Sequence, residues 1–171
     1  MSALAARASA ARPEPAAAPV ARRAVYLHPG HVVVSGEPAA VTTILGSCVS
    51  VCLWDARLRV GGMNHFLLPN HAGMGTASAR FGCVAMRKLL DGMRSLGCRT
   101  ADLDARVIGG ACVVEAFRGT GEGHLGDRNA ELALQALEHH GIRVTRCDVG
   151  GHRGRKLLFH TDEGTAAVRL I

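Results

Sequence analysis

The chain has 171 residues, of which 48% are hydrophobic and only 4% aromatic, and its formal net charge is +6. This length suits one domain with an aliphatic core, while the lack of a basic stripe interleaved with aromatic residues argues against nucleic-acid binding, and no apolar run is long enough to insert into a bilayer. The six cysteines form no CxxC pair, and no secretory signal peptide is recognisable, so we expect a reduced, cytoplasmic protein.

The first 23 residues are rich in Ala, Pro and Arg and show no apolar period, so residues 1–23 predict a disordered tail. A single domain is then expected over residues 24–171. Apolar segments of strand length predict its first four strands, at residues 32–34, 42–45, 48–54 and 59–68. The third is apolar on both faces, which indicates a central strand, and a turn after it predicts a hairpin with the fourth.

The second half of the chain alternates between helical and strand-like segments. Apolar residues at helical spacing predict one helix over residues 78–96 and another over residues 127–140. Between them lie an apolar, strand-like segment at 105–117 and a glycine-rich loop at 118–126. Three more strands are predicted at the end of the chain, at residues 144–149, 156–160 and 166–170. Many strands with two helices indicate an α+β domain.

The segment Gly46-Ser47-Cys48 stands at the start of the predicted central strand. Glycine permits a tight turn there, and such a turn can aim the Cys48 backbone N–H at whatever the sulfur attacks, as half of an oxyanion hole. A thiol needs a basic neighbour to act as a nucleophile, and His65 on the paired strand lies at a comparable distance from the shared turn. A hydroxyl on the preceding strand, Thr42 or Thr43, could hold the tautomer of His65.

These residues by themselves also fit a protein without chemistry. A cysteine in an apolar strand is more typical of packing than of catalysis, and a binding module would need no nucleophile. Thiol reactivity should separate the two hypotheses, because a catalytic Cys48 is expected to alkylate faster than the other five cysteines near neutral pH.

The glycine-rich loop offers a rival hypothesis. Residues 121–126 match GxGxxG between a predicted strand and helix, and Asp148 follows at a position suited to a ribose-binding acid. However, residues 118–120 separate the strand from the glycines, and no second nucleotide-binding half follows, so a plain flexible loop is favoured. A metal site is not favoured either, because His139 and His140 are adjacent and face different sides of a helix.

Several short motifs in this order resemble the CheD family of chemoreceptor glutamine deamidases. The matching segments are Leu27-His28-Pro29-Gly30, Thr42-Thr43-Ile44-Leu45-Gly46-Ser47-Cys48-Val49, Gly61-Gly62-Met63-Asn64-His65-Phe66-Leu67-Leu68-Pro69, Gly109-Gly110, Gly126-Asp127-Arg128-Asn129 and Gly150-Gly151 through Gly154-Arg155-Lys156. They cover nearly all of the chain after the tail. The Gly-Ser-Cys and Gly-Gly-Met-Asn-His blocks are the specific ones.

The resemblance implies mixed β-sheets in a sandwich-like core flanked by helices, similar to the cytotoxic necrotizing factor-type deamidase fold. It implies a protein-glutamine glutaminase with Cys48 as nucleophile, His65 as base and Thr42 as the third residue, supported at the oxyanion by Ser47 and Gly46. No cofactor or metal is expected.

The implied substrates are glutamine side chains of methyl-accepting chemotaxis receptors, and some members of the family also bind a CheC-type phosphatase. The basic residues Arg153, Arg155 and Lys156 then have two interpretations. They form either a solvated turn or a contact with an acidic receptor helix.

Overall fold

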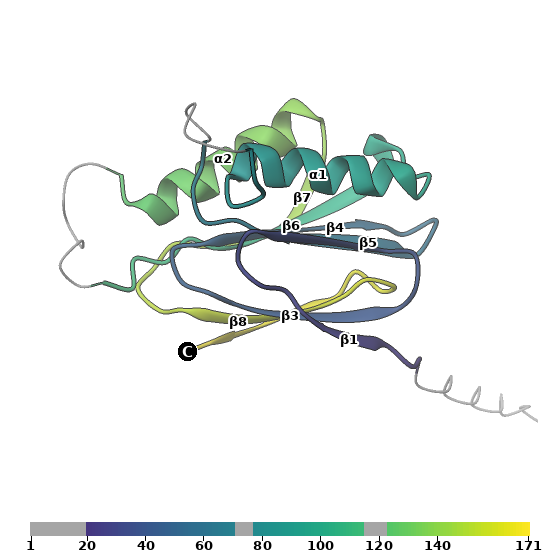
Figure 1. The fold of residues 1–171 in the computed structure, drawn as a ribbon, viewed down its shortest axis with the longest axis horizontal. Coiled ribbons are helices and arrows are strands. Elements are labelled where there is room, and N and C mark those ends of the chain that lie inside the picture. Colours follow the sequence, from purple (N-terminus) through teal and green to yellow (C-terminus); the bar gives the residue numbers. More distant parts are fainter. Residues whose placement is uncertain (1–19, 71–76, 115–122) are drawn as a thin grey trace, which may run out of the picture.

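The computed structural model describes residues 20–70, 77–114 and 123–171. It has three layers: a pair of helices, a five-stranded sheet beneath them and a four-stranded sheet on the far side (Figure 1). This arrangement confirms the predicted α+β class and the two stacked mixed sheets. The likeness to the cytotoxic necrotizing factor-type fold stays a prediction.

The five-stranded sheet has the order β2-β5-β4-β6-β7, and all of its pairs are antiparallel except β6 with β7. Its strands are β2 (His31–Ser35), β5 (Val60–His65), β4 (Val49–Asp55), β6 (Leu103–Gly109) and β7 (Arg143–Val149). The four-stranded sheet has the order β1-β3-β8-β9, in which β1 runs parallel to β3. Its strands are β1 (Arg23–Tyr26), β3 (Ala39–Leu45), β8 (Arg155–His160) and β9 (Ala166–Leu170).

Helices α1 (Gly82–Ser95) and α2 (Leu125–His139) cover the outer face of the five-stranded sheet, and a short 3₁₀ turn, η1 (Thr100–Asp102), precedes β6. Strand β4 is buried on both faces, as predicted. Its odd-numbered residues Val51 and Leu53 pack against the helices, whereas Cys52 packs between the two sheets with Met63 and Phe159. None of the described helices is both long enough and apolar enough to cross a membrane.

The glycine pair in β5 lets both neighbouring layers approach that strand. A Cβ atom on Gly61 would lie 2.9 Å from the Thr161 carbonyl oxygen, and one on Gly62 would lie 2.8 Å from Leu89 Cδ1. The buried Asn64 beside them accepts a hydrogen bond from the Val51 N–H at 2.8 Å through its side-chain oxygen. These motif residues therefore serve the packing around β5.

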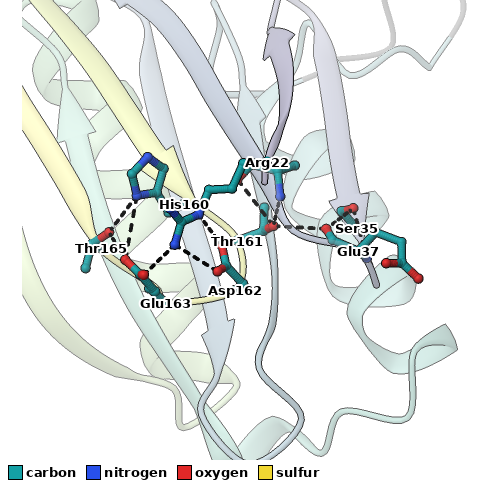
Figure 2. Close-up of polar contacts among 9 residues, drawn as sticks. Arg22, Ser35, Glu37, His160, Thr161, Asp162, Glu163 and Thr165 are labelled. Atoms are coloured by element: carbon teal, nitrogen blue, oxygen red, sulfur yellow. Dashed lines mark hydrogen bonds and ion pairs between the residues drawn. The ribbon is translucent and has the colours of Figure 1, made fainter. Parts of the chain in front are cut away.

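The fold begins slightly earlier than predicted. Strand β1 starts at Arg23, and the Arg22 guanidinium donates to both carboxylate oxygens of Asp162, at 2.8 and 2.9 Å, and also to Glu163 (Figure 2). Nearby, the buried Thr161 hydroxyl accepts from the Ala39 N–H at 2.9 Å. The domain thus includes Arg22, while most of the predicted tail lies outside the described residues.

Two other predicted boundaries differ. Helix α1 begins at Gly82 rather than at residue 78, because the chain before it pairs with Leu68 in an isolated bridge, and the Gly82 N–H donates to the Leu68 carbonyl at 2.7 Å. Strand β6 ends at Gly109 rather than at residue 117. Gly109 and Gly110 have φ values of +123° and +68°, which are incompatible with a continuing strand.

Candidate active site

The turn that carries Cys48 is held by hydrogen bonds from the segment after β6. The Gly46 carbonyl accepts from the Ala111 N–H at 2.8 Å, and the Cys48 carbonyl accepts from the Gly110 N–H at 2.8 Å. A Cβ atom on Gly109 would lie 2.2 Å from the Cys48 carbonyl oxygen, so only glycine permits this approach. The glycine motif at the end of β6 therefore shapes the turn before Cys48.

The N-terminal residues of helix α2 support the same Cys48 turn. A Cβ atom on Gly126 would lie 2.2 Å from the Gly110 carbonyl oxygen, so the helix packs directly on the glycine segment. The buried Asn129 donates from Nδ2 to the Ser47 carbonyl at 3.0 Å. Separate glycine-containing motifs of the sequence thus converge on the residues around Cys48.

The register of β4 and β5 brings Cys48 and His65 to one face of the sheet. Val49 and Phe66 exchange backbone hydrogen bonds of 3.1 and 3.0 Å, in the same register as Cys52 opposite Met63. His65 is therefore diagonal to Cys48, and diagonal neighbours in an antiparallel pair lie about 7–8 Å apart, within reach of a long side chain. The predicted pairing of these two strands is confirmed, with Cys48 one residue before β4 and His65 at the end of β5.

His65 is buried, and its hydrogen bonds define which ring nitrogen carries the proton. The Thr43 hydroxyl donates to the Leu27 carbonyl at 2.7 Å, and the same oxygen lies 2.8 Å from His65 Nδ1. A hydroxyl has one proton, and because the Thr43 hydroxyl donates it to Leu27, we assign Thr43 as the acceptor of an Nδ1–H. The neutral ring then has a bare Nε2, which is buried and has no hydrogen-bond partner among the described residues.

The partner of His65 is thus Thr43, whereas the resemblance pointed to Thr42. Strand β3 alternates, with Val41, Thr43 and Leu45 buried between the sheets and Thr42 on the opposite face. Thr42 takes part through its backbone instead, because its carbonyl accepts from the Leu27 N–H at 2.9 Å. The assignment of Thr42 as the residue that orients His65 is wrong in this structure.

Burial keeps both members of the pair neutral. Desolvation raises the pKa of the Cys48 thiol above its ordinary value, and the backbone N–H of Cys48 itself partly offsets this effect. Burial also lowers the pKa of His65 to about 4. The Leu27 carbonyl partly opposes this shift because it favours the charged ring, whereas repulsion from His31 adds to it. Both groups are therefore neutral at rest, a thiol at Cys48 and an imidazole at His65, rather than a thiolate and an imidazolium.

The predicted supporting residues, Gly46 and Ser47, shape the turn through their carbonyl groups. The Gly46 carbonyl accepts from the Ala111 N–H, and the Ser47 carbonyl accepts from Asn129 Nδ2. The Cys48 N–H then lies on the side of its own sulfur. That orientation suits an amide that meets an oxyanion formed next to the sulfur. Asn129 is the last residue of the motif Gly126-Asp127-Arg128-Asn129, which by itself did not indicate this role.

The alternative sites find less support. Asp148 is held by ion pairs of 3.2 Å to Arg146 and 2.9 Å to Arg155. Residues 121 and 122 of the GxGxxG segment lie outside the described residues, and its last residue, Gly126, already belongs to helix α2. Arg155, one residue of the predicted basic cluster, is buried and therefore has a structural role. Within the described ranges, no three His, Cys, Asp or Glu side chains are grouped so that they could hold a metal ion.

Comparisons with known proteins identify consistent relatives. A family model described as CheD chemotactic sensory transduction matches residues 67–170. A protein of Anaeromyxobacter dehalogenans named "Probable chemoreceptor glutamine deamidase CheD 1" is 53% identical over 150 residues, covering 88% of this chain and 86% of its own. One from Trichlorobacter lovleyi, named "Probable chemoreceptor glutamine deamidase CheD", is 43% identical over 142 residues, covering 83% and 87%.

Among solved structures, the chain resembles a Neisseria meningitidis protein of the family DUF152. The TM-score is 0.45 at 14% identity, with 76% of this chain and 64% of the other covered.

Proposed function

The chain belongs to the CheD family, and from this premise we propose that it hydrolyses the side-chain amide of specific glutamines on methyl-accepting chemotaxis receptors. The products are a glutamate side chain and ammonia. We propose Cys48 as the nucleophile, His65 as the proton carrier and Thr43 as the residue that orients His65. The reaction consumes only water, so it needs no cofactor.

The observation that carries the mechanism is the hydrogen-bond chain Leu27–Thr43–His65. It fixes the proton on Nδ1 and leaves Nε2 bare on the face that also carries Cys48. A bare, buried ring nitrogen without a partner is the group that a general base requires. Because the thiol is neutral at rest, sulfur must transfer its proton to Nε2 as it attacks.

The chemical steps follow from this starting state. The Cys48 sulfur bonds to the carboxamide carbon while its proton moves to His65 Nε2, and the carbonyl electrons move onto oxygen, where the Cys48 N–H can meet them. Collapse of this intermediate breaks the C–N bond, and Nε2–H gives its proton to the departing ammonia. The resulting thioester is attacked by water, whose proton passes to Nε2 and then to the sulfur that leaves.

Thr43 differs from the aspartate of a serine protease triad, since it is neutral. It accepts the Nδ1–H hydrogen bond but adds no negative charge to stabilise the imidazolium. The low pKa of His65 agrees with this lack of compensation. We therefore expect a slow enzyme, which suits the adjustment of receptors more than bulk metabolism.

The proposed partners are receptor cytoplasmic regions, which places the reaction in the cytoplasm. A CheC-type phosphatase remains a predicted second partner. A competing proposal, a binding module that engages these partners without chemistry, would leave the bare Nε2 and the Thr43 contact without a purpose.

The experiment is peptide mass spectrometry of a receptor cytoplasmic fragment incubated with the protein. Deamidation should appear as the mass change from amide to acid at particular glutamines, and Cys48→Ala should abolish it. Unchanged receptor fragments, together with tight binding of those fragments, would replace the enzyme by the binding module.

A further inference from the structure

We infer that Asn129 is a positioning residue that fixes the Cys48 turn relative to the strand that carries His65. This inference rests on the proposed function, and it adds a residue from helix α2 to a site otherwise built from strands. Asn129 touches neither reacting group; it acts through the backbone on each side of them.

The contacts of Asn129 join two separate segments. Its Nδ2 donates to the Ser47 carbonyl at 3.0 Å and to the Leu67 carbonyl at 2.8 Å, and the side chain is fully buried. Ser47 directly precedes Cys48, and Leu67 follows His65 by two residues. One carboxamide therefore holds the nucleophile turn and the end of the base strand at a fixed separation.

The orientation of this amide is determined by its partners. Both partners are carbonyl oxygens, so a flipped side chain would set its own oxygen against two acceptors. Both Nδ2 hydrogens are then used, one on each segment. Asn129 Oδ1 remains buried without a hydrogen-bond partner in the described part of the chain, a cost that a residue selected for stability alone would avoid.

The ladder between β4 and β5 explains why such a tie is needed. Its last backbone exchange joins Val49 and Phe66. At the next hydrogen-bonding position, where Ser47 would oppose Leu68, the strands are no longer joined, because the Leu68 N–H donates to the Arg80 carbonyl at 3.1 Å. Asn129 donates to the Ser47 carbonyl instead, so it replaces the ladder at the residue before Cys48.

Catalysis depends strongly on this separation. A misplacement of about 1 Å between reacting groups costs on the order of a hundredfold in rate. Loss of the two Asn129 hydrogen bonds frees the turn to move away from β5. We expect kcat to fall by roughly tenfold to a hundredfold and KM to stay within twofold, because substrate contacts are unaffected.

The test uses Asn129→Ala and Asn129→Asp, the second of which keeps the shape but removes both N–H donors. Thr161→Val is the matched control, since Thr161 is also buried and bonded to a backbone N–H, but at the β8–β9 end of the sandwich. Besides receptor deamidation, the rate of Cys48 alkylation by iodoacetamide is followed by peptide mass spectrometry. That readout needs no substrate and includes His65→Gln alone and combined with Asn129→Ala.

The inference predicts that Cys48 alkylation slows in His65→Gln and slows similarly in Asn129→Ala and Asn129→Asp, with no further loss in the double variant. Thr161→Val should alkylate like the wild type even if it is destabilised. Wild-type Cys48 reactivity and kcat in both Asn129 variants would overturn the role of Asn129 and leave the proposed function intact. Wild-type reactivity in His65→Gln would overturn both, because Cys48 and His65 would then not act together.

Discussion

Replacing Thr43 by valine should impair catalysis strongly, whereas the same change at Thr42 should not. Valine keeps the shape of threonine but removes the hydroxyl that accepts from His65 Nδ1 and donates to Leu27. Thr42 lies on the other face of β3, so Thr42→Val is a matched control one residue away.

The magnitude follows from the hydrogen bonds that are lost. An unmade hydrogen bond at a buried polar group costs about 1–3 kcal/mol. The Thr43 hydroxyl stabilises the His65 tautomer that has a bare Nε2. In Thr43→Val this reactive tautomer therefore loses the energy of the hydrogen bond. With about 1.36 kcal/mol for each factor of ten, kcat/KM should fall roughly 5- to 150-fold in Thr43→Val.

The assay is the initial rate of deamidation of a receptor fragment, with ¹⁵N NMR of the histidine rings as a second measurement. The wild-type His65 should show a protonated Nδ1 and a bare Nε2, and Thr43→Val should show a mixture of tautomers. Loss of activity in Thr42→Val with full activity in Thr43→Val would refute the assignment and restore the one implied by the family pattern.

Other predictions follow from the charges and backbone of the site. Because the folded-state pKa of His65, about 4, lies below its ordinary value of 6.5, activity should decline on the acid side near pH 4, measured as kcat/KM against pH. As pH falls from 6.5 to 4 the unfolded chain binds the proton first, so stability is lost across that window. By pH 5 the free energy of unfolding, measured with urea, should have fallen by about 2 kcal/mol, and this loss should be absent in His65→Gln. The sequence predicted that Cys48 alkylates faster than the other cysteines, but its pKa is raised. At neutral pH the exposed Cys83 and Cys147 should therefore alkylate before Cys48. Gly109→Ala should destabilise the protein and abolish activity, because φ is +123° and the added Cβ would meet the Cys48 carbonyl.

The pairing of the strands next to Cys48 and His65 could be predicted because they form one hairpin, where counting from the turn fixes the register. The choice between Thr42 and Thr43 also had a local signal. Leu45 is an inward-facing core residue, and the alternation of a strand turns Thr43 to the same side. Spacing from Cys48 alone carried no information about the face of the strand.

The role of Asn129 could not be predicted in this way. Its contact with Ser47 joins residues 82 positions apart, and it depends on how α2 crosses the sheet. The parallel pairing of β1 with β3 is likewise a long-range property of two strands that show no distinctive pattern. The early end of β6 follows from the positive φ angles at Gly109 and Gly110. The apolar residues that continue after these glycines in the sequence had predicted a longer strand.

The most direct test of the central claim is to trap the covalent intermediate on Cys48. A receptor fragment mixed with the protein, quenched in acid and mapped by mass spectrometry should show a receptor peptide joined to Cys48 with loss of ammonia, and hydroxylamine should release it as a hydroxamate. Deamidated receptor formed without such an adduct, at the same rate in Cys48→Ala, would contradict the account.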